Sequence, residues 1–266
     1  MTKSSFFSLT RFATALFLTS FKAAAAQRRA FVLQALFMAI NNLVFFTFWW
    51  LLFQRVRSIR GFLLGDVAAQ FGVSAAGFGL AVGVGGGLLR LGRMIDEGEL
   101  DALLTQPKPT LLYAVGIRSQ ASGLGDLASG AVLLVASGAV TWTRAPLLLL
   151  AVVASAVTIL ASGILFYSLS FWLRKSEALS RQLFDFLITF SLYPEPLFGG
   201  ALRLVLYTVI PAGFASYAPL AALREPSLVT VGILLIAPPA YLALAGWVFR
   251  RGLRRYSSGS RFGVFA

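Results

Sequence analysis

The sequence predicts an all-α polytopic membrane protein. Hydrophobic residues make up 58% of the 266-residue chain, charged residues make up 12%, and the mean hydropathy is +0.81. A soluble domain of this size needs more polar surface, and several uncharged runs reach the length of about 20 residues that crosses a bilayer as a helix. We expect six transmembrane helices, an N-terminal interfacial helix, and a re-entrant helical segment between spans five and six.

The chain contains neither cysteine nor histidine. This composition excludes Ser-His and Cys-His catalysis and the usual zinc and haem ligands. It also excludes disulfides, so cysteine usage says nothing about the redox compartment. We therefore predict no catalytic residue and no metal site.

Residues 1–30 predict an amphipathic helix that lies in the membrane interface and ends at Arg28–Arg29. One side of this helix is apolar and the other is polar or basic: Leu9, Phe12, Ala13, Leu16 and Phe17 against Arg11, Thr14 and Lys22. The alternative is a signal peptide cleaved after the alanines at 23–26. Lys22 makes a signal peptide the less favoured interpretation, because this charged residue separates the apolar run from the supposed cleavage site.

Residues 31–266 are expected to form one transmembrane domain. Its predicted spans are 31–53, 67–89, 119–143, 145–173, 178–193 and 227–249. Basic residues at both ends place both termini in the cytoplasm, so the number of crossings must be even. The apolar run within 194–224 carries Pro211 and Pro219, which keep helices short. We therefore predict that 194–224 enters the outer leaflet and returns.

The net charge of +13 does not require a nucleic-acid partner. In this topology most of the 23 Lys and Arg residues lie on the cytoplasmic side. The exceptions are Arg55, Arg57, Arg60, Arg144, Arg203 and Arg224. The positive-inside bias thus accounts for most of the charge, and the lipid bilayer is the expected partner.

Two spans carry features beyond hydrophobicity. Asn41 and Asn42 interrupt the first span, and with Phe45 they are candidates for lining a substrate pathway; the alternative is that the amides bind a neighbouring helix. In the second span, Ala75, Gly79, Gly83 and Gly87 recur every four residues and form a strip of small side chains. Such a strip lets another helix approach closely, either from this chain or from a second copy.

Four of the ten acidic residues fall between positions 96 and 101. Asp96 can cap a helix and Glu99 follows it by three residues, as in a capping box. Pro107 disfavours continuation beyond Gln106. This pattern predicts a helix over about 95–105 that could dock on a partner; the alternative is a solvated loop.

Nucleotide-binding motifs are absent from the sequence, since nothing matches G-x-x-x-x-G-K-[ST] or G-x-G-x-x-G. Gly123 to Asp126 matches the G-x-G-D motif of intramembrane aspartyl proteases, with Asp185 as a candidate partner. However, the Tyr-Asp and Pro-Ala-Leu motifs of those proteases are missing. The milder interpretation is that Asp126 pairs with Arg118 and holds helices together.

The segment I-D-E-G-E-L-D-A-L-L-T-Q-P at 95–107 resembles the cytoplasmic signature of bacterial ABC transporter permeases of the type-2 exporter class. Further matches are Gly125–Asp126, Y-P-x-x-x-F at 193–198, and T-V-I-P-A-G-F-x-x-Y-x-P at 208–219. The motifs occur in the family's order along nearly the whole chain. One departure is Gln106, where this branch often has arginine.

The resemblance implies an ATP-driven exporter in the bacterial inner membrane, with cytoplasmic N- and C-termini. Two permease copies, or two related chains, would work with cytoplasmic ATPase subunits that hold ATP and Mg, while this chain binds no cofactor. The segment after the second span would be the coupling helix, with apolar contacts from leucine and isoleucine and polar contacts from the acids. Its residues are Ile95, Asp96, Glu97, Gly98, Glu99, Leu100, Asp101, Leu103, Leu104 and Pro107.

The uncharged spans suggest an apolar or amphiphilic substrate. The main alternative function is an ion-coupled secondary transporter or a channel. Such proteins are expected to carry charged or paired polar residues at mid-membrane, or repeated halves. The spans here hold few charges and no convincing repeat, which favours the permease interpretation.

Overall fold

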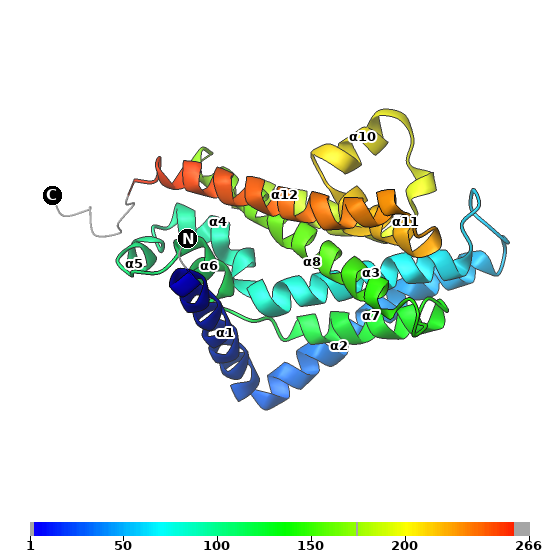
Figure 1. The fold of residues 1–266 in the computed structure, drawn as a ribbon. Coiled ribbons are helices and arrows are strands. Elements are labelled where there is room, and N and C mark those ends of the chain that lie inside the picture. Colours follow the sequence, from blue (N-terminus) through cyan, green and yellow to red (C-terminus); the bar gives the residue numbers. More distant parts are fainter. Residues whose placement is uncertain (1–2, 174, 258–266) are drawn as a thin grey trace.

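A computed structural model describes residues 3–173 and 175–257, in which every regular element is a helix (Figure 1). The α-helices, in order, are α1 (Lys3–Ala26), α2 (Arg28–Phe53), α3 (Leu64–Gly85), α4 (Leu91–Asp96), α5 (Asp101–Leu104), α6 (Thr110–Gly116), α7 (Ser122–Ala136), α8 (Ala145–Tyr167), α9 (Glu177–Leu192), α10 (Gly200–Thr208), α11 (Ala218–Arg224) and α12 (Leu228–Leu253). Short 3-10 or π segments adjoin three of them, η1 (Gly86–Arg90) after α3, η2 (Ser168–Phe171) after α8 and η4 (Gly213–Tyr217) before α11, and η3 (Glu195–Leu197) stands alone between α9 and α10. The all-α prediction is confirmed.

The N-terminal helix is separated from α2 by a sharp bend at Gln27 (Figure 1). Gln27 has φ −89° and ψ 65°, which is outside the helical region. The predicted end of the first helix at Arg28–Arg29 is therefore wrong, because these arginines begin α2 instead. Whether α1 lies in the membrane interface stays a prediction.

One long helical rod, Leu64–Asp96, forms the centre of the bundle, and α7 and α8 pack along it. α7 runs antiparallel to α3. An added Cβ at Gly79 would collide with the carbonyl oxygen of Gly123, and one at Gly87 with that of Ala114. An added Cβ at Gly83 would meet nothing within 4 Å, so Gly83 does not share the close contact expected of the strip.

Helix α9 ends where the YPEP sequence stops it, and two side chains of α3 satisfy the freed carbonyl groups. Gln70 Nε2 donates to the Ser191 oxygen at 3.1 Å and to the Tyr193 oxygen at 2.7 Å. Ser74 Oγ donates to the same Ser191 oxygen at 3.1 Å. Such bonds allow a helix to end among membrane spans without an unpaired backbone group.

The segment between α9 and α12 is bent. α10 and the η4–α11 helix meet at 79°, as in a broken span or a re-entrant loop. Its connections are made by tyrosines and an acid: Tyr207 donates to Glu195 Oε1 at 3.0 Å, and Tyr217 donates to the Phe190 oxygen at 2.7 Å. Arg203 also pairs with Glu195 at 2.8 Å. The re-entrant course through the outer leaflet stays a prediction.

By length and composition, four helices of the described residues can cross a membrane: α2, the rod Leu64–Asp96, Ala145–Phe171 and α12. The number becomes five if the bent pair is one span. α7 and α9, predicted as spans three and five, have only 15 and 16 helical residues. They are shorter than the roughly 20 residues of a full crossing, so the count of six stays a prediction.

Candidate functional site

The acidic stretch folds as a turn between two short helices. α4 ends at Asp96 and α5 begins at Asp101. The continuous helix predicted over about 95–105 is therefore wrong. Gly98 has φ +78°, a left-handed conformation that glycine adopts without steric cost and that interrupts an α-helix. The Asp101 amide donates to the Gly98 oxygen at 3.2 Å and closes the turn. We call residues 96–101 the acidic turn.

Three of the four apolar residues expected to contact a partner face the interior instead. Ile95 and Leu103 are each 6% exposed and Leu100 is fully buried, whereas Leu104 is 42% exposed. The buried three join the main hydrophobic core with residues of α6, α8 and α9. The turn ends the helical periodicity, so neighbouring leucines and acids no longer share a face. Of the residues expected to contact a partner, Leu104, Pro107 and the acidic side chains remain at the surface.

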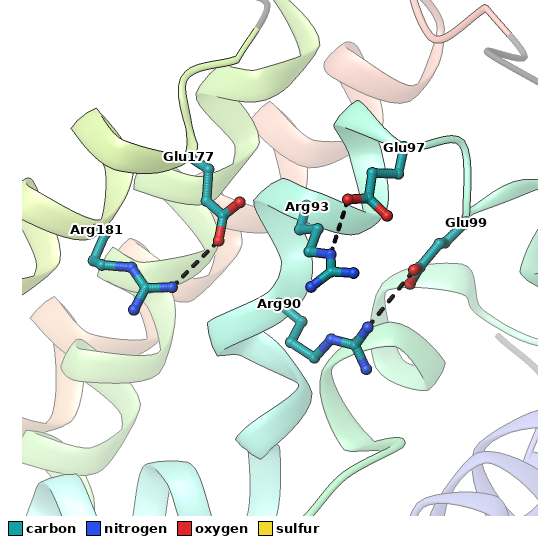
Figure 2. A network of polar contacts seen from close by, with 6 residues as sticks. All are labelled: Arg90, Arg93, Glu97, Glu99, Glu177 and Arg181. Atoms are coloured by element: carbon teal, nitrogen blue, oxygen red, sulfur yellow. Dashed lines mark hydrogen bonds and ion pairs between the residues drawn. The ribbon is translucent and has the colours of Figure 1, made fainter. Parts of the chain in front are cut away.

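Arginines of the same rod pair with the acidic turn (Figure 2). Arg93 Nε donates to Glu97 Oε1 at 3.0 Å, and Arg90 Nη2 lies 3.6 Å from Glu99 Oε1. These four side chains are between 30% and 48% exposed, and surface pairs of this kind contribute about 0–1 kcal/mol. Their main effect is to orient the carboxylates.

A charged cavity of about 780 Å³ separates the acidic turn from the start of α9. Its lining carries both signs of charge: Arg93, Asp96, Glu97, Lys175, Glu177, Ala178, Arg181, Gln182 and Asp185. On the α9 side, Arg181 pairs with Glu177 at 3.2 Å (Figure 2). On the other side, Ser170 Oγ donates to Asp96 Oδ2 at 3.3 Å. This lining suits a polar partner surface better than an apolar ligand.

The C-terminal end of α12 also reaches the acidic turn. The Tyr256 ring packs edge-on against Phe171, with ring centroids 6.2 Å apart. Burial and the neighbouring Asp101 carboxylate raise the pKa of Tyr256 to about 12. Tyr256 therefore stays neutral throughout the physiological pH range, and its ring packs on the η2 segment.

Helix α1 packs on the other side of this region through α6. The Phe12 and Tyr113 rings stack with centroids 6.0 Å apart, and Lys108 Nζ lies 4.9 Å from the Phe12 centroid. Helices from the start, middle and end of the chain thus converge around the acidic turn. A displacement of the turn would therefore change the packing of all these helices.

The candidates for a substrate pathway separate in the structure. Asn42 is 7% exposed, and its Nδ2 donates to Asp126 Oδ1 at 2.7 Å and to Ser129 Oγ at 2.9 Å. The amide joins α2 to α7, as the alternative interpretation expects, and its place in a substrate pathway stays a prediction. Asn41 is exposed, and Phe45 is 37% exposed with its ring 5.8 Å from that of Phe71.

Replacing Asn42 by leucine is expected to destabilise the protein by about 1–3 kcal/mol, because Asp126 and Ser129 lose a buried donor. Thermal unfolding of the purified protein in detergent measures this effect. Asn41→Leu is the control, since the exposed Asn41 amide binds neither residue. Equal unfolding temperatures for the two variants would contradict the α2–α7 bond.

The two aspartates of the protease interpretation have different neighbours. Asp126 binds Asn42 from α2, rather than the Arg118 that the sequence suggested. Asp185 lines a cavity with Tyr167 and Arg181. A shared proton requires two carboxyl groups in contact, which this arrangement does not provide.

Comparison with known protein families decides the class of this chain. The sequence profile described as ABC-2 family transporter protein matches residues 38–260. The chain belongs to the ABC-2 transporter family. Searches of the curated proteins and of the solved structures gave no match. As an ABC-2 family member, the protein is a membrane permease of an ABC transporter, and the family implies an ABC ATPase as its partner.

In this ABC-2 permease, sequence reasoning missed the basic half of the site. Arg93 precedes Glu97 by four residues and Glu177 precedes Arg181 by four, a spacing that pairs opposite charges on a helix. That signal was available in the sequence. The contact between Tyr256 and Asp101 had no such signal, since it joins residues from opposite halves of the chain.

Proposed function

We propose that this ABC-2 permease is the membrane subunit of a bacterial exporter and that its ATPase docks on the acidic turn. One observation carries the proposal: the acidic turn stands at the end of the long rod Leu64–Asp96, which packs against α7 and α8. A push on the turn is therefore transmitted to the centre of the bundle. ATP and Mg would be held by the ATPase.

The arrangement of the helices supports a common cytoplasmic end. The beginning of α1, the helices α4, α5 and α6, and the end of α12 lie at one end of the molecule (Figure 1). α12 ends with Arg250 and Arg251. The positive-inside rule places this end in the cytoplasm, where the ATPase is found. In the inner membrane, two permease copies or two related chains would rotate as rigid bodies when the ATPases close.

The composition of the spans suggests the cargo class. The long helices α8 and α12 contain no charged residue before their last turns. We infer an apolar or amphiphilic substrate, moved outward by alternating access.

Purification tests the proposal. The permease, extracted from its own membrane in mild detergent, is expected to carry a soluble ATPase with the nucleotide-binding motifs that this chain lacks. Added ATP should be hydrolysed faster when cargo of the inferred class is present. Repeated isolation of the permease alone, together with transport that continues without ATP, would contradict the proposal.

A further inference from the structure

A groove of about 790 Å³ lies between α2 and the start of α7, away from the acidic turn. Half of its lining is apolar and half is uncharged but able to form hydrogen bonds: Phe37, Met38, Ile40 and Val44, and Gln34, Asn41, Gln120 and Ser122. We call it the α2 groove. Helix α2 runs along the edge of the bundle in Figure 1.

The amides in the α2 groove lack partners. Within residues 3–173 and 175–257, the side chains of Gln34, Asn41 and Gln120 make no hydrogen bond. Asn42, the next residue, is fully engaged with Asp126. Only 6% of the apolar part of α2 is buried inside the molecule, so its exposed amides, Gln34 and Asn41, face the lipid. An unpaired amide in hydrocarbon is costly, and an occupant with hydrogen-bonding groups is therefore favoured.

The charge at the end of the groove selects the occupant. Arg28 and Arg29 are exposed at the start of α2, about 9 Å along the helix from Gln34. Arg118 is exposed two residues before Gln120. The first acidic residue of the chain is Asp66, so no carboxylate of α1 or α2 offsets these arginines. Arginines at the end of an apolar groove are complementary to an amphiphile with an anionic headgroup.

We propose that the α2 groove binds an anionic phospholipid of the cytoplasmic leaflet. Its phosphate lies beside the arginines, since guanidinium groups bind phosphate with strong, charge-assisted hydrogen bonds. Its glycerol esters accept hydrogen bonds from Gln34, Gln120 and Ser122. Its acyl chains cover Phe37 and Met38. Lipid binding here does not depend on the docking of an ATPase, so either proposal can fail without the other.

Native mass spectrometry of the full chain in neutral detergent tests this site. Phosphatidylglycerol and phosphatidylcholine are added in equal amounts, and retention of phosphatidylglycerol alone is expected. Arg28→Gln with Arg29→Gln should lower that retention about 25-fold, at about fivefold per arginine. The matched control, Arg250→Gln with Arg251→Gln, removes two arginines at the end of α12 and should leave retention unchanged.

A second pair of variants tests the groove itself without changing the charge. Gln34→Leu with Gln120→Leu should lower retention by about fivefold for each hydrogen bond lost. Equal retention of both lipids, or equal losses in the two arginine variants, would overturn the proposal.

Coverage by a second permease copy is the remaining outcome to test. The chain has no cysteine, so Asn41→Cys introduces a single reactive position. Efficient cross-linking of two copies through this cysteine in the membrane, together with no retained lipid, would assign the groove to the second copy and overturn lipid binding.

Discussion

Reversing two charges of the acidic turn, Glu97→Arg with Asp101→Arg, is expected to abolish substrate-stimulated ATPase activity of the assembled transporter. In the proposed complex these carboxylates meet basic or amide groups of the ATPase, and like charges at an interface repel. We expect stimulation to fall at least about tenfold, which corresponds to about 1.4 kcal/mol of lost interaction. The measurement is ATP hydrolysis by the co-purified complex with and without cargo.

The internal pair of Glu97 requires its own control. Glu97→Arg alone breaks the bond from Arg93, whose Nε lies 3.0 Å from Glu97 Oε1. The exchange Arg93→Glu with Glu97→Arg restores an ion pair on the same helix face but keeps a positive charge at position 97. Docking on the turn predicts that this exchange also lowers coupling. Glu225→Arg, an exposed reversal on the loop before α12, should have no effect.

Two outcomes would contradict the docking role. Full substrate stimulation of ATP hydrolysis in the Glu97→Arg, Asp101→Arg protein would show that the ATPase does not bind these carboxylates. Full recovery of ATPase stimulation in the exchange variant would show that coupling needs only the internal ion pair, and not a contact between Glu97 and the ATPase. Elution as a single species in detergent verifies that each variant is folded.

The helices of the bundle could be predicted from the sequence because their signal is local. An uncharged run of over 20 residues predicts a crossing helix, and α2 and α12 begin within three residues of the expected positions. Helix ends that depend on the backbone conformation of a single residue are harder to predict from the sequence. The helix over 95–105 failed at Gly98, because helix propensity alone does not reveal a glycine with positive φ.

Tertiary partners account for the larger errors at the candidate site. Leu100 looked available for docking because acids surround it in the sequence, yet the core formed with α6, α8 and α9 buries it. Asn42 is a pathway candidate because it is polar within an apolar span, and the sequence alone does not show its partner Asp126, 84 positions away. A residue's chain neighbours do not determine its role when distant helices complete its environment.

Two glycines of α3 test whether distant helices determine the role of a residue. Gly79 and Gly83 occupy equivalent positions of the four-residue repeat, but only at Gly79 would an added Cβ meet another helix. Gly79→Ala is expected to destabilise the bundle by about 3 kcal/mol, at the upper end of overpacking, because its Cβ would enter the backbone of α7 at Gly123 and Leu127. Gly83→Ala adds a methyl group that meets nothing within 4 Å. It should stabilise the helix by about 0.5–1 kcal/mol through lower backbone entropy. Thermal unfolding in detergent measures both. Shifts of the same sign would mean that α3 and α7 do not approach each other as described, and that the small-residue strip instead faces another molecule along its whole length.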